Sequence, residues 1–176
     1  MQARQAGEKR RRVFFTSDTH FGDHRVLNIA RRPFTSVAEM NEALVARWNA
    51  RVGPDDEVWH LGDFATARVA PTIWPKLNGR KRLIVGNNDG PGVRALGWCS
   101  VQDYAELAAG GVQLVLCHYP FRTWNGAHRG AINLHGHSHG RLKSLPRQFD
   151  VGVDCRDFAP ISLDQLLSRR DSPKRA

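Results

Sequence analysis

Histidine, aspartate and asparagine residues gather at five places along the chain, and each place follows a short apolar run. The five groups are Asp18-Thr19-His20, Gly62-Asp63, Gly86-Asn87-Asn88-Asp89, His118 and Gly136-His137-Ser138-His139. Carboxylate, amide oxygen and imidazole are together the ligands that Mn²⁺, Fe, Zn²⁺, Ni²⁺ and Co²⁺ take in proteins. The residue types therefore indicate a site for divalent metal ions.

The spacing within the groups fits this interpretation. Asp18 and His20 are two positions apart, so they share one side of an extended chain. His137 and His139 flank one residue of a turn and can face different ions. A glycine precedes Asp63, Asn87 and His137, where it lets the backbone bend sharply and approach a ligand closely. A lone histidine is more simply a hydrogen-bonded core residue, but five such groups in order favour one shared site.

Short apolar, β-prone runs precede the groups and predict the strands that position them. These strands are expected over residues 13–17, 57–61, 82–85, 112–117 and 131–135. Functional groups in open α/β sheets gather beyond the carboxyl ends of the strands. We therefore expect the five groups to converge. A further strand is predicted over residues 149–153.

Two helices are marked by their first turns. Ser36-Val37-Ala38-Glu39 has capping-box spacing, and the helix it begins is predicted to run to about Ala50 with apolar residues at helical intervals. Ser162-Leu163-Asp164-Gln165 caps a short final helix, and residues 53–56 form a turn.

Composition indicates one globular domain outside the membrane. The chain has 176 residues, 41% hydrophobic and 24% charged. No run approaches the roughly 20 apolar residues that span a bilayer. Arg11-Arg12 is followed by only three apolar residues, which is too few for an export signal. We expect a cytoplasmic protein.

The three cysteines are odd in number and include no CxxC pair, which argues against a disulfide framework or a cysteine zinc site. Cys117 stands beside His118 and could be a reactive thiol. A small buried residue on a strand is the more frequent role.

The net charge of +9 is concentrated at the two ends. Residues 1–12 hold five basic residues against Glu8, and residues 168–176 hold four against Asp171. We interpret both ranges as basic, flexible tails on a domain over 13–167. Basic tails can attract nucleic acid, although solvated ends are more common.

The order Asp-x-His, Gly-Asp, Gly-Asn-x-Asp, His and Gly-His-x-His over residues 18–139 resembles the calcineurin-like metallophosphoesterase superfamily. Small bacterial members are the most similar. The segments that carry the resemblance are residues 16–22, Arg32-Pro33-Phe34, Met40-Asn41-Glu42, Trp48-Asn49, residues 60–64, His118-Tyr119-Pro120 and residues 134–140.

The resemblance implies an α/β fold: a single-domain sandwich of two mixed β-sheets flanked by helices. It also divides the ligands between two divalent metal ions. Mn²⁺ is the expected ion, and Fe, Zn²⁺, Ni²⁺ and Co²⁺ are alternatives. One ion is expected to bind Asp18, His20, Asp63 and His139, and the other Asp63, Asn87, His118 and His137. A shared Asp63 fits the physics, because two cations about 4 Å apart repel and need an anion between them.

The implied activity is hydrolysis of a phosphate monoester or diester by a hydroxide that bridges the two ions. Asp63, His118 and Asn88 would then act at the reaction centre. About 20 residues separate His118 from His139, too few for a cap domain, so we expect an open cleft and a small or nucleotide-like substrate. Arg122, Trp124, Asn125 and Arg129 in that loop are candidate substrate contacts or ordinary surface.

Asn88 departs from the family pattern, in which this position is usually histidine. The histidine is assigned to protonate the leaving group or to stabilise the transition state. An amide donates hydrogen bonds but delivers no proton, and general acid catalysis contributes roughly 10²–10⁴-fold. His24 and His128 are candidate replacements, with exposed loop histidines as the simpler interpretation. Asp89 would keep its role beside the metal ligands.

Two further hypotheses stay open. The first is a nuclease that uses the basic tails to hold DNA or RNA. The second is a catalytically weak scaffold or binding module, which Asn88 favours and the full ligand set opposes. The sequence leaves the oligomeric state undetermined.

Overall fold

The computed structural model describes residues 11–143 and 145–168. Its strands form two sheets. The first, in the order β4-β3-β2-β1-β9, comprises Val101–Gln102, Arg80–Ile84, Glu57–His60, Val13–Thr16 and Ile161–Ser162. The second, in the order β5-β6-β7-β8, comprises Tyr104–Ala109, Val112–Cys117, Ile132–His135 and Gln148–Asp150. Each sheet has one antiparallel pair, β1–β9 or β5–β6, among parallel neighbours.

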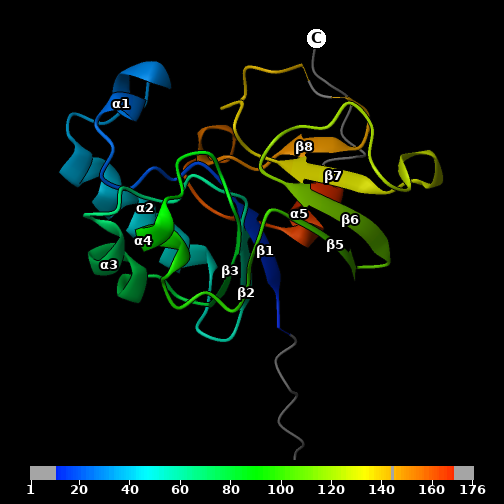
Figure 1. Ribbon diagram of the computed structural model, residues 1–176, viewed down its shortest axis with the longest axis horizontal. Coiled ribbons are helices and arrows are strands. Elements are labelled where there is room, and N and C mark those ends of the chain that lie inside the picture. Colours follow the sequence, from blue (N-terminus) through cyan, green and yellow to red (C-terminus); the bar gives the residue numbers. More distant parts are fainter. Residues whose placement is uncertain (1–10, 144, 169–176) are drawn as a thin grey trace, which may run out of the picture.

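Short helices and one long one surround the sheets. The α-helices are α1 (Arg25–Ile29), α2 (Val37–Arg51), α3 (Ala70–Ile73), α4 (Pro91–Arg94) and α5 (Leu163–Ser168). The 3₁₀ turns are η1 (Trp74–Lys76), η2 (Ala127–Arg129) and η3 (Val153–Cys155). Figure 1 shows α1–α4 on one side of β1–β3 and the second sheet on the other. The predicted fold class, two mixed sheets flanked by helices, is confirmed.

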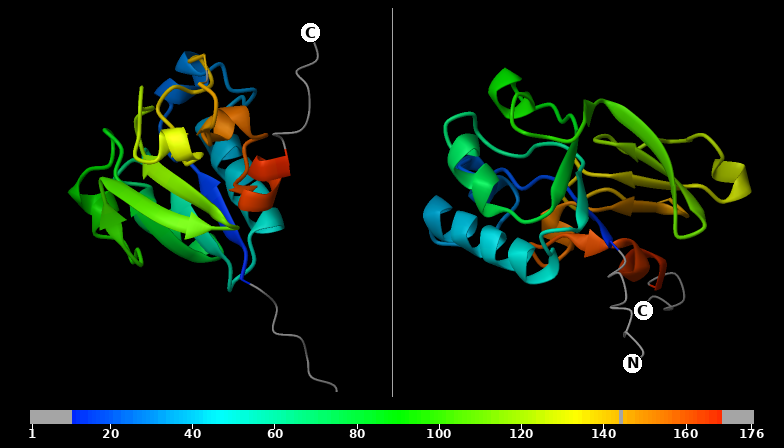
Figure 2. Two further views of the ribbon diagram at one scale, coloured as in Figure 1. Left: turned by 90° about the vertical axis from the view of Figure 1, so that its right-hand side faces the viewer. Right: turned by 90° about the horizontal axis from the view of Figure 1, so that it is seen from below.

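Alternating side chains on the central strands fill two cores. Phe14, Val58 and Leu83 face the helices, where they pack with residues of α2. Their neighbours along the strands, among them Phe15, face the second sheet and pack against Leu116 and Leu134. The first sheet is thus covered on both faces, which explains the consecutive apolar residues of β1, VFF, and those at the end of β3, LI. The right-hand view of Figure 2 shows α2 and the second sheet on opposite sides of it.

Both predicted helix caps are present. The Ser36 hydroxyl accepts from the Glu39 amide at 3.1 Å, and α2 buries Met40, Leu44 and Trp48. Ser162 and Gln165 exchange two hydrogen bonds, of 3.1 and 3.2 Å, at the start of α5.

The predicted strand over 149–153 ends earlier, at Asp150. The Asp150 carboxylate accepts from the amides of Gly152 and Gly140, at 2.8 and 2.9 Å, and these bonds turn the chain away from the sheet. Strand β5 was not predicted. Its sequence, YAELAA, contains good helix formers, and its six-residue pairing with β6 overrides that preference.

Arg12, placed in the N-terminal tail on sequence grounds, contacts the domain: its guanidinium donates to Asp56 at 2.7 Å. The rest of the predicted tails, residues 1–10 and 169–176, lies outside the described residues. Within the described ranges, no helix is both long and apolar enough to cross a membrane. Cys117 is buried on β6, and burial raises the pKa of its thiol, so the structure supports the packing role.

Candidate metal centre

The five groups singled out in the sequence follow the carboxyl ends of five strands. Those strands are β1, β2 and β3 of the first sheet and β6 and β7 of the second. Both sheets therefore contribute side chains to one region, as the strand pattern predicts.

The backbone at these groups is unusual. Positive φ angles occur at Asp18 (55°), His20 (48°), Asp63 (58°), His137 (65°) and His139 (48°). Residues other than glycine rarely adopt this left-handed conformation, which costs roughly 1–2 kcal/mol. Such strain persists where the surrounding structure holds it, and it concentrates at functional sites.

The glycines before three of the groups leave room for the donors, as the sequence predicts. A Cβ at Gly62 would lie 2.5 Å from His118 Nδ1, and one at Gly86 would lie 2.4 Å from Asp63 Oδ1. A Cβ at Gly136 would lie 1.9 Å from Ser17 Oγ and 2.4 Å from Asp18 Oδ2.

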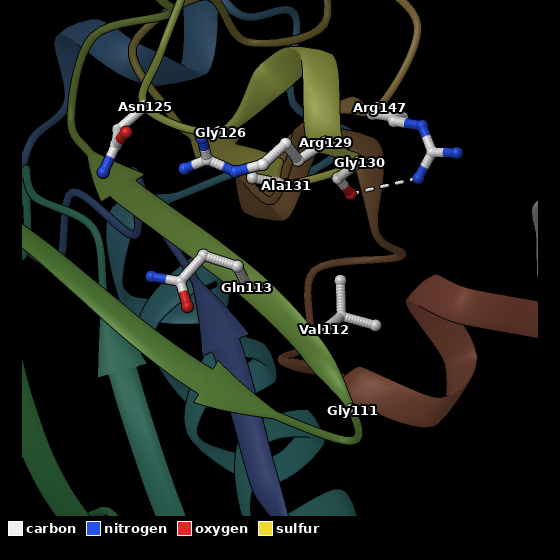
Figure 3. A pocket seen from close by; sticks show the side chains of 9 residues that line it. All are labelled: Gly111, Val112, Gln113, Asn125, Gly126, Arg129, Gly130, Ala131 and Arg147. Atoms are coloured by element: carbon white, nitrogen blue, oxygen red, sulfur yellow. Dashed lines mark hydrogen bonds between the residues drawn. The ribbon is translucent and has the colours of Figure 1, made fainter.

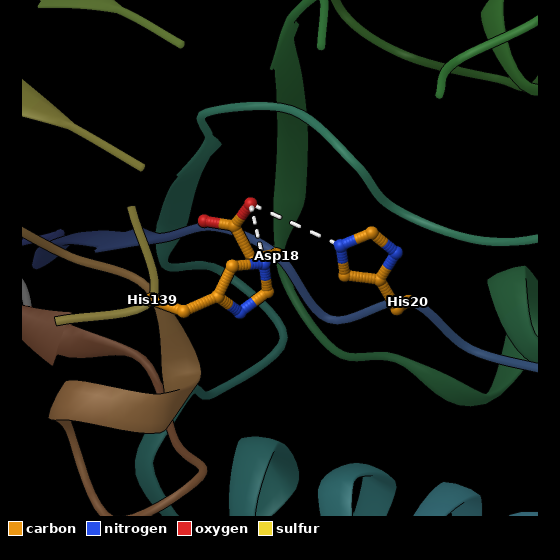
Figure 4. A group of neighbouring side chains, drawn as sticks. All are labelled: Asp18, His20 and His139. Carbon is orange, nitrogen blue, oxygen red and sulfur yellow. Dashed lines mark ion pairs between the residues drawn. The ribbon is translucent and has the colours of Figure 1, made fainter. Parts of the chain in front are cut away.

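Asp18, His20 and His139 form the first cluster of donors. Figure 4 shows both imidazoles turned toward the Asp18 carboxylate, one from the loop after β1 and one from the loop after β7. Asp18 Oδ1 lies 4.0 Å from His20 Nε2 and 3.9 Å from His139 Nε2.

Asn87, His118 and His137 form the second cluster. Asn87 Oδ1 lies 3.0 Å from both His118 Nε2 and His137 Nδ1. The other ring nitrogen of His118, Nδ1, donates to the carbonyl of Leu61 at 2.7 Å. That bond leaves Nε2 free to act as a ligand.

Asp63 lies between the two clusters. Its Oδ2 is 3.5 Å from His20 Nε2 and 3.7 Å from His118 Nε2. Ligand atoms about 2.1 Å from one ion stand about 3.0–3.4 Å apart, so these separations are close to those of a coordination shell.

The donors fit a cation by their hydrogen bonding as well. Asp18 Oδ1 and His20 Nε2 are buried and have no hydrogen-bond partner in the described structure. An unsatisfied buried polar atom costs roughly 1–3 kcal/mol. Both atoms point into the first cluster, where a bound cation would satisfy them together.

The protonation states of His20, His137 and Asp18 suit metal binding at neutral pH. Burial lowers the pKa of His20 to about 4 and also lowers the pKa of His137, so both rings are neutral and keep a lone pair. The pKa of His139 is raised instead, because the effect of its burial is outweighed by Asp154 and Asp18, so this ring must release a proton to bind a metal ion. Burial raises the pKa of Asp18 to about 6, which still leaves its carboxylate mostly ionised at neutral pH.

Sequence reasoning missed the roles of two residues: Asp154, which contacts His139, and Arg32, which contacts Asp154. Asp154 Oδ2 lies 2.7 Å from His139 Nδ1, and the same carboxylate takes two hydrogen bonds from Arg32, of 2.8 and 2.9 Å. Arg32 also donates to the carbonyls of Asp18 and Thr19, at 2.6 and 2.9 Å. Arg32 stands in the family-like Arg32-Pro33-Phe34 segment, which was the available signal. The sequence around Asp154 contains no motif that would indicate its role.

Asn88 and Asp89 hold Asp63. Both carboxylate oxygens of Asp63 accept from Asn88: Oδ1 from the backbone amide at 2.8 Å and Oδ2 from the side-chain amide at 2.6 Å. Asp89 accepts from the amides of Asp63, Phe64 and Gly86 at 2.8–2.9 Å. The described structure thus gives Asn88 a contact with the central carboxylate.

The two histidines considered as replacement acids differ in their placement. His24 is exposed at the start of α1, in the segment that follows the first group of donors. His128 lies in η2, before the amino end of β7, whereas His137 and His139 follow the carboxyl end of that strand.

The four candidate substrate contacts in the loop between β6 and β7 also lie in different places. Arg122 is exposed soon after β6 ends. The Trp124 indole donates to the carbonyl of Ala131 at 3.0 Å, a contact within the loop itself. Asn125 and Arg129 line a cavity together with the first residues of β6, at the end of that strand opposite His118.

Two neighbours of the clusters were not among the candidate site residues, although one of them, Tyr119, lies in the family-like segment His118-Tyr119-Pro120. Arg25 lines a cavity of about 90 Å³ together with His20, Asp63 and Asn88. The ring of Tyr119 lies 4.7 Å from that of His137, and 46% of the residue is exposed.

The fold and these clusters define the class: an α/β sandwich with a candidate metal centre at the strand ends. No family model matches the chain. The chain is 30% identical to the uncharacterized protein MJ1445 of Methanocaldococcus jannaschii over 89% of its length and 90% of that protein. It is 33% identical to the gene 66 protein of Mycobacterium phage D29, over 85% of this chain and 92% of that protein. The chain belongs to the family of these proteins.

Among solved structures, a protein of unknown function from Aquifex aeolicus, AQ665, has the same fold. Its TM-score is 0.70 at 22% identity, over 90% of this chain and 98% of that one. An archaeal phosphodiesterase overlaps at a TM-score of 0.44 and 17% identity, over 80% of this chain and 82% of that one. An overlap as low as the second carries no information about function.

Proposed function

We propose that this chain hydrolyses phosphate esters with two divalent metal ions held by the two clusters. The observation that carries the proposal is the position of the Asp63 carboxylate, 3.5 Å from a nitrogen of one cluster and 3.7 Å from a nitrogen of the other. A shared anion is what two adjacent cations need. The ligand sets are Asp18, His20, Asp63 and His139 for one ion and Asp63, Asn87, His118 and His137 for the other.

Bound cations at such a site supply Lewis-acid chemistry, which polarises phosphate oxygens and generates a nucleophile from water at neutral pH. The protein's part is to fix the donors. Asn88 and Asp89 hold Asp63 and the backbone beside it, and Asp154 holds His139. Mn²⁺ is the expected ion, with Fe, Zn²⁺, Ni²⁺ and Co²⁺ as alternatives for the same donors.

Two side chains next to the clusters suit a phosphate group. Arg25 and Asn88 line the small cavity that His20 and Asp63 also line. The Arg25 guanidinium is paired with Asp23 at 2.8 Å and remains 62% exposed, so its other edge can donate to a phosphate oxygen. Small or nucleotide-like phosphate esters are the substrates that we expect for a cavity of about 90 Å³.

The proposal is tested by metal analysis and turnover together. Wild type loaded with Mn²⁺ should hold two ions per chain and hydrolyse bis(p-nitrophenyl) phosphate. Asp63→Ala should lose this turnover and at least one ion. Asp55→Ala, which removes an exposed carboxylate in the turn before β2, is the matched control and should behave as wild type. Two bound ions without turnover of any ester would replace the proposal by the scaffold hypothesis.

A further inference from the structure

Residues 107–149 contain no aspartate or glutamate, although the whole chain contains 17. The same segment carries five cations: Arg122, Arg129, Arg141, Lys143 and Arg147. All five are exposed, and none takes part in the ion pairs found among the described residues. These cations are therefore free to interact with a negatively charged partner.

Two of the cations line a cavity of about 590 Å³ on the second sheet. Arg129 and Arg147 surround it together with Gln113 and Asn125, and no carboxylate is among the residues that line it. In Figure 3 the Arg129 side chain extends toward Asn125, and the Arg147 guanidinium lies beyond Gly130. Arg147 donates to the Gly130 carbonyl at 3.0 Å, which leaves most of its donors unused.

Aromatic side chains connect this cavity with the metal centre. Tyr119 packs against His118 and His137 at 5.0 and 4.7 Å between ring centroids. Two positions further along, Phe121 lies 6.1 Å from the ring of Tyr104, which is 41% exposed.

The path then continues through hydrogen bonds. The Tyr104 hydroxyl donates to Glu106, and Asn125 of the cavity donates to the same carboxylate at 2.9 Å. Two acidic residues lie along this path: Glu106, whose oxygens accept from these donors, and the exposed Asp103 beside Tyr104. These contacts link the metal centre, the aromatic rings and the cavity at the other end of β6, and together they define one candidate surface along β5 and β6.

We infer that this surface binds single-stranded nucleic acid and leads it to the metal centre. Unpaired cations neutralise the phosphates, and exposed rings stack on bases, as in other proteins that hold single strands. An acidic protein would match the charge but would leave the rings without a role. A double-stranded nucleic acid fits less well, because its bases are stacked inside the duplex and cannot stack on the exposed rings. The inference rests on the proposed function in one respect, because the bound strand supplies the phosphodiester.

The test measures binding of a fluorescent twelve-residue oligothymidylate to the full chain. All proteins carry Asp63→Asn, so that the strand is not cut. Arg129→Gln/Arg147→Gln is compared with Lys76→Gln/Arg80→Gln, which removes two exposed charges at the amino end of β3, away from the centre. The tails are the same in every protein, and thermal melting checks that each variant is folded.

Loss of two phosphate contacts should lower the slope of log affinity against log salt by about 1.4 and weaken binding about 25-fold at 0.1 M salt. The control pair should change neither. Tyr104→Leu should weaken binding at least about fivefold and leave the slope unchanged, because stacking is not ionic. Equal losses in the two charge pairs would overturn the inference, and so would an equal loss of polyglutamate binding.

Hydrolysis of bis(p-nitrophenyl) phosphate by wild type separates this inference from the proposed function. If wild type hydrolyses the ester but strand binding is the same with and without Arg129 and Arg147, the inferred binding surface is wrong and the proposed function is still supported. Strand binding that depends on both arginines, without hydrolysis of any ester, would overturn the function and support a binding surface alone.

Discussion

At the scale of single residues, the centre consists of donors and of the groups that hold them. The convergence of the donor side chains could be predicted from the sequence, because each follows a strand. Their role as metal ligands stays a prediction, which rests on their residue types. Asn88 belongs to the groups that hold a donor, because its backbone amide and its side-chain amide both donate to the Asp63 carboxylate. The amide that replaces the expected histidine therefore steadies the central carboxylate but delivers no proton.

Asn88→His should increase turnover most for esters with poor leaving groups. An imidazole at this position can protonate an alkoxide, a step that contributes roughly 10²-fold or more. The measurement is the ratio of kcat/KM for an alkyl ester to that for a nitrophenyl ester, with Asn88→Gln as the control that keeps an amide. An unchanged ratio in Asn88→His would contradict this explanation of the missing acid.

Asp154→Asn should weaken binding of the ion at the first cluster by about 10–100-fold, the usual effect of removing a carboxylate that orients a ligating histidine. Asp154 Oδ2 contacts His139 Nδ1 at 2.7 Å and keeps Nε2 directed at Asp18. Titration calorimetry with Mn²⁺ measures the effect at each site. Asp164→Asn removes an exposed carboxylate on α5 and should change neither affinity.

At the scale of elements, the strand ends and their glycines determine how closely the two sheets approach. Six strands (β1–β3 and β6–β8), the long helix and both caps were predictable because their apolar runs and capping residues are local signals. Strand β5 and the pair Arg32–Asp154 were not. The first depends on pairing with β6, and the second joins residues 122 positions apart.

Gly86→Ala should destabilise the fold and impair metal binding together. The new methyl group would lie 2.4 Å from both the Asp63 amide nitrogen and Asp63 Oδ1, so Asp63 must move. Overpacking of this kind costs about 1–3 kcal/mol. Gly90→Ala is the matched control, because a Cβ there has nothing within 4 Å. Chemical denaturation and Mn²⁺ titration measure both effects, and unchanged Mn²⁺ affinity in Gly86→Ala would contradict the prediction.

At the scale of the whole molecule, the two sheets share a core and also share the ligand set. Residues such as Phe15 of β1 and Leu134 of β7 pack into the same cluster. The three donors that follow β6 and β7 therefore reach the centre only when the sheets are packed together. Formation of the site and of the inter-sheet core should be one event.

Leu134→Ala should lower the free energy of unfolding by about 2–5 kcal/mol, because Leu134 is fully buried between the sheets. Both halves should still unfold in one transition. Tryptophan fluorescence, which reports mainly on the helical half through Trp48, Trp74 and Trp98, should coincide with far-UV circular dichroism in urea. Leu142→Ala, at an exposed position, should have little effect. Two separate transitions would mean that the layers fold independently.

The left-handed backbone at the donors has a consequence for how this protein could be altered. His137 is exposed, and its φ of 65° is one that glycine adopts without strain. Replacing it by glycine would remove a proposed ligand while relieving the backbone, so we expect the variant to bind Mn²⁺ more weakly and to melt at a higher temperature than the parent. Selection for heat tolerance alone would therefore tend to remove the candidate centre, and a simultaneous demand for the proposed activity would retain it.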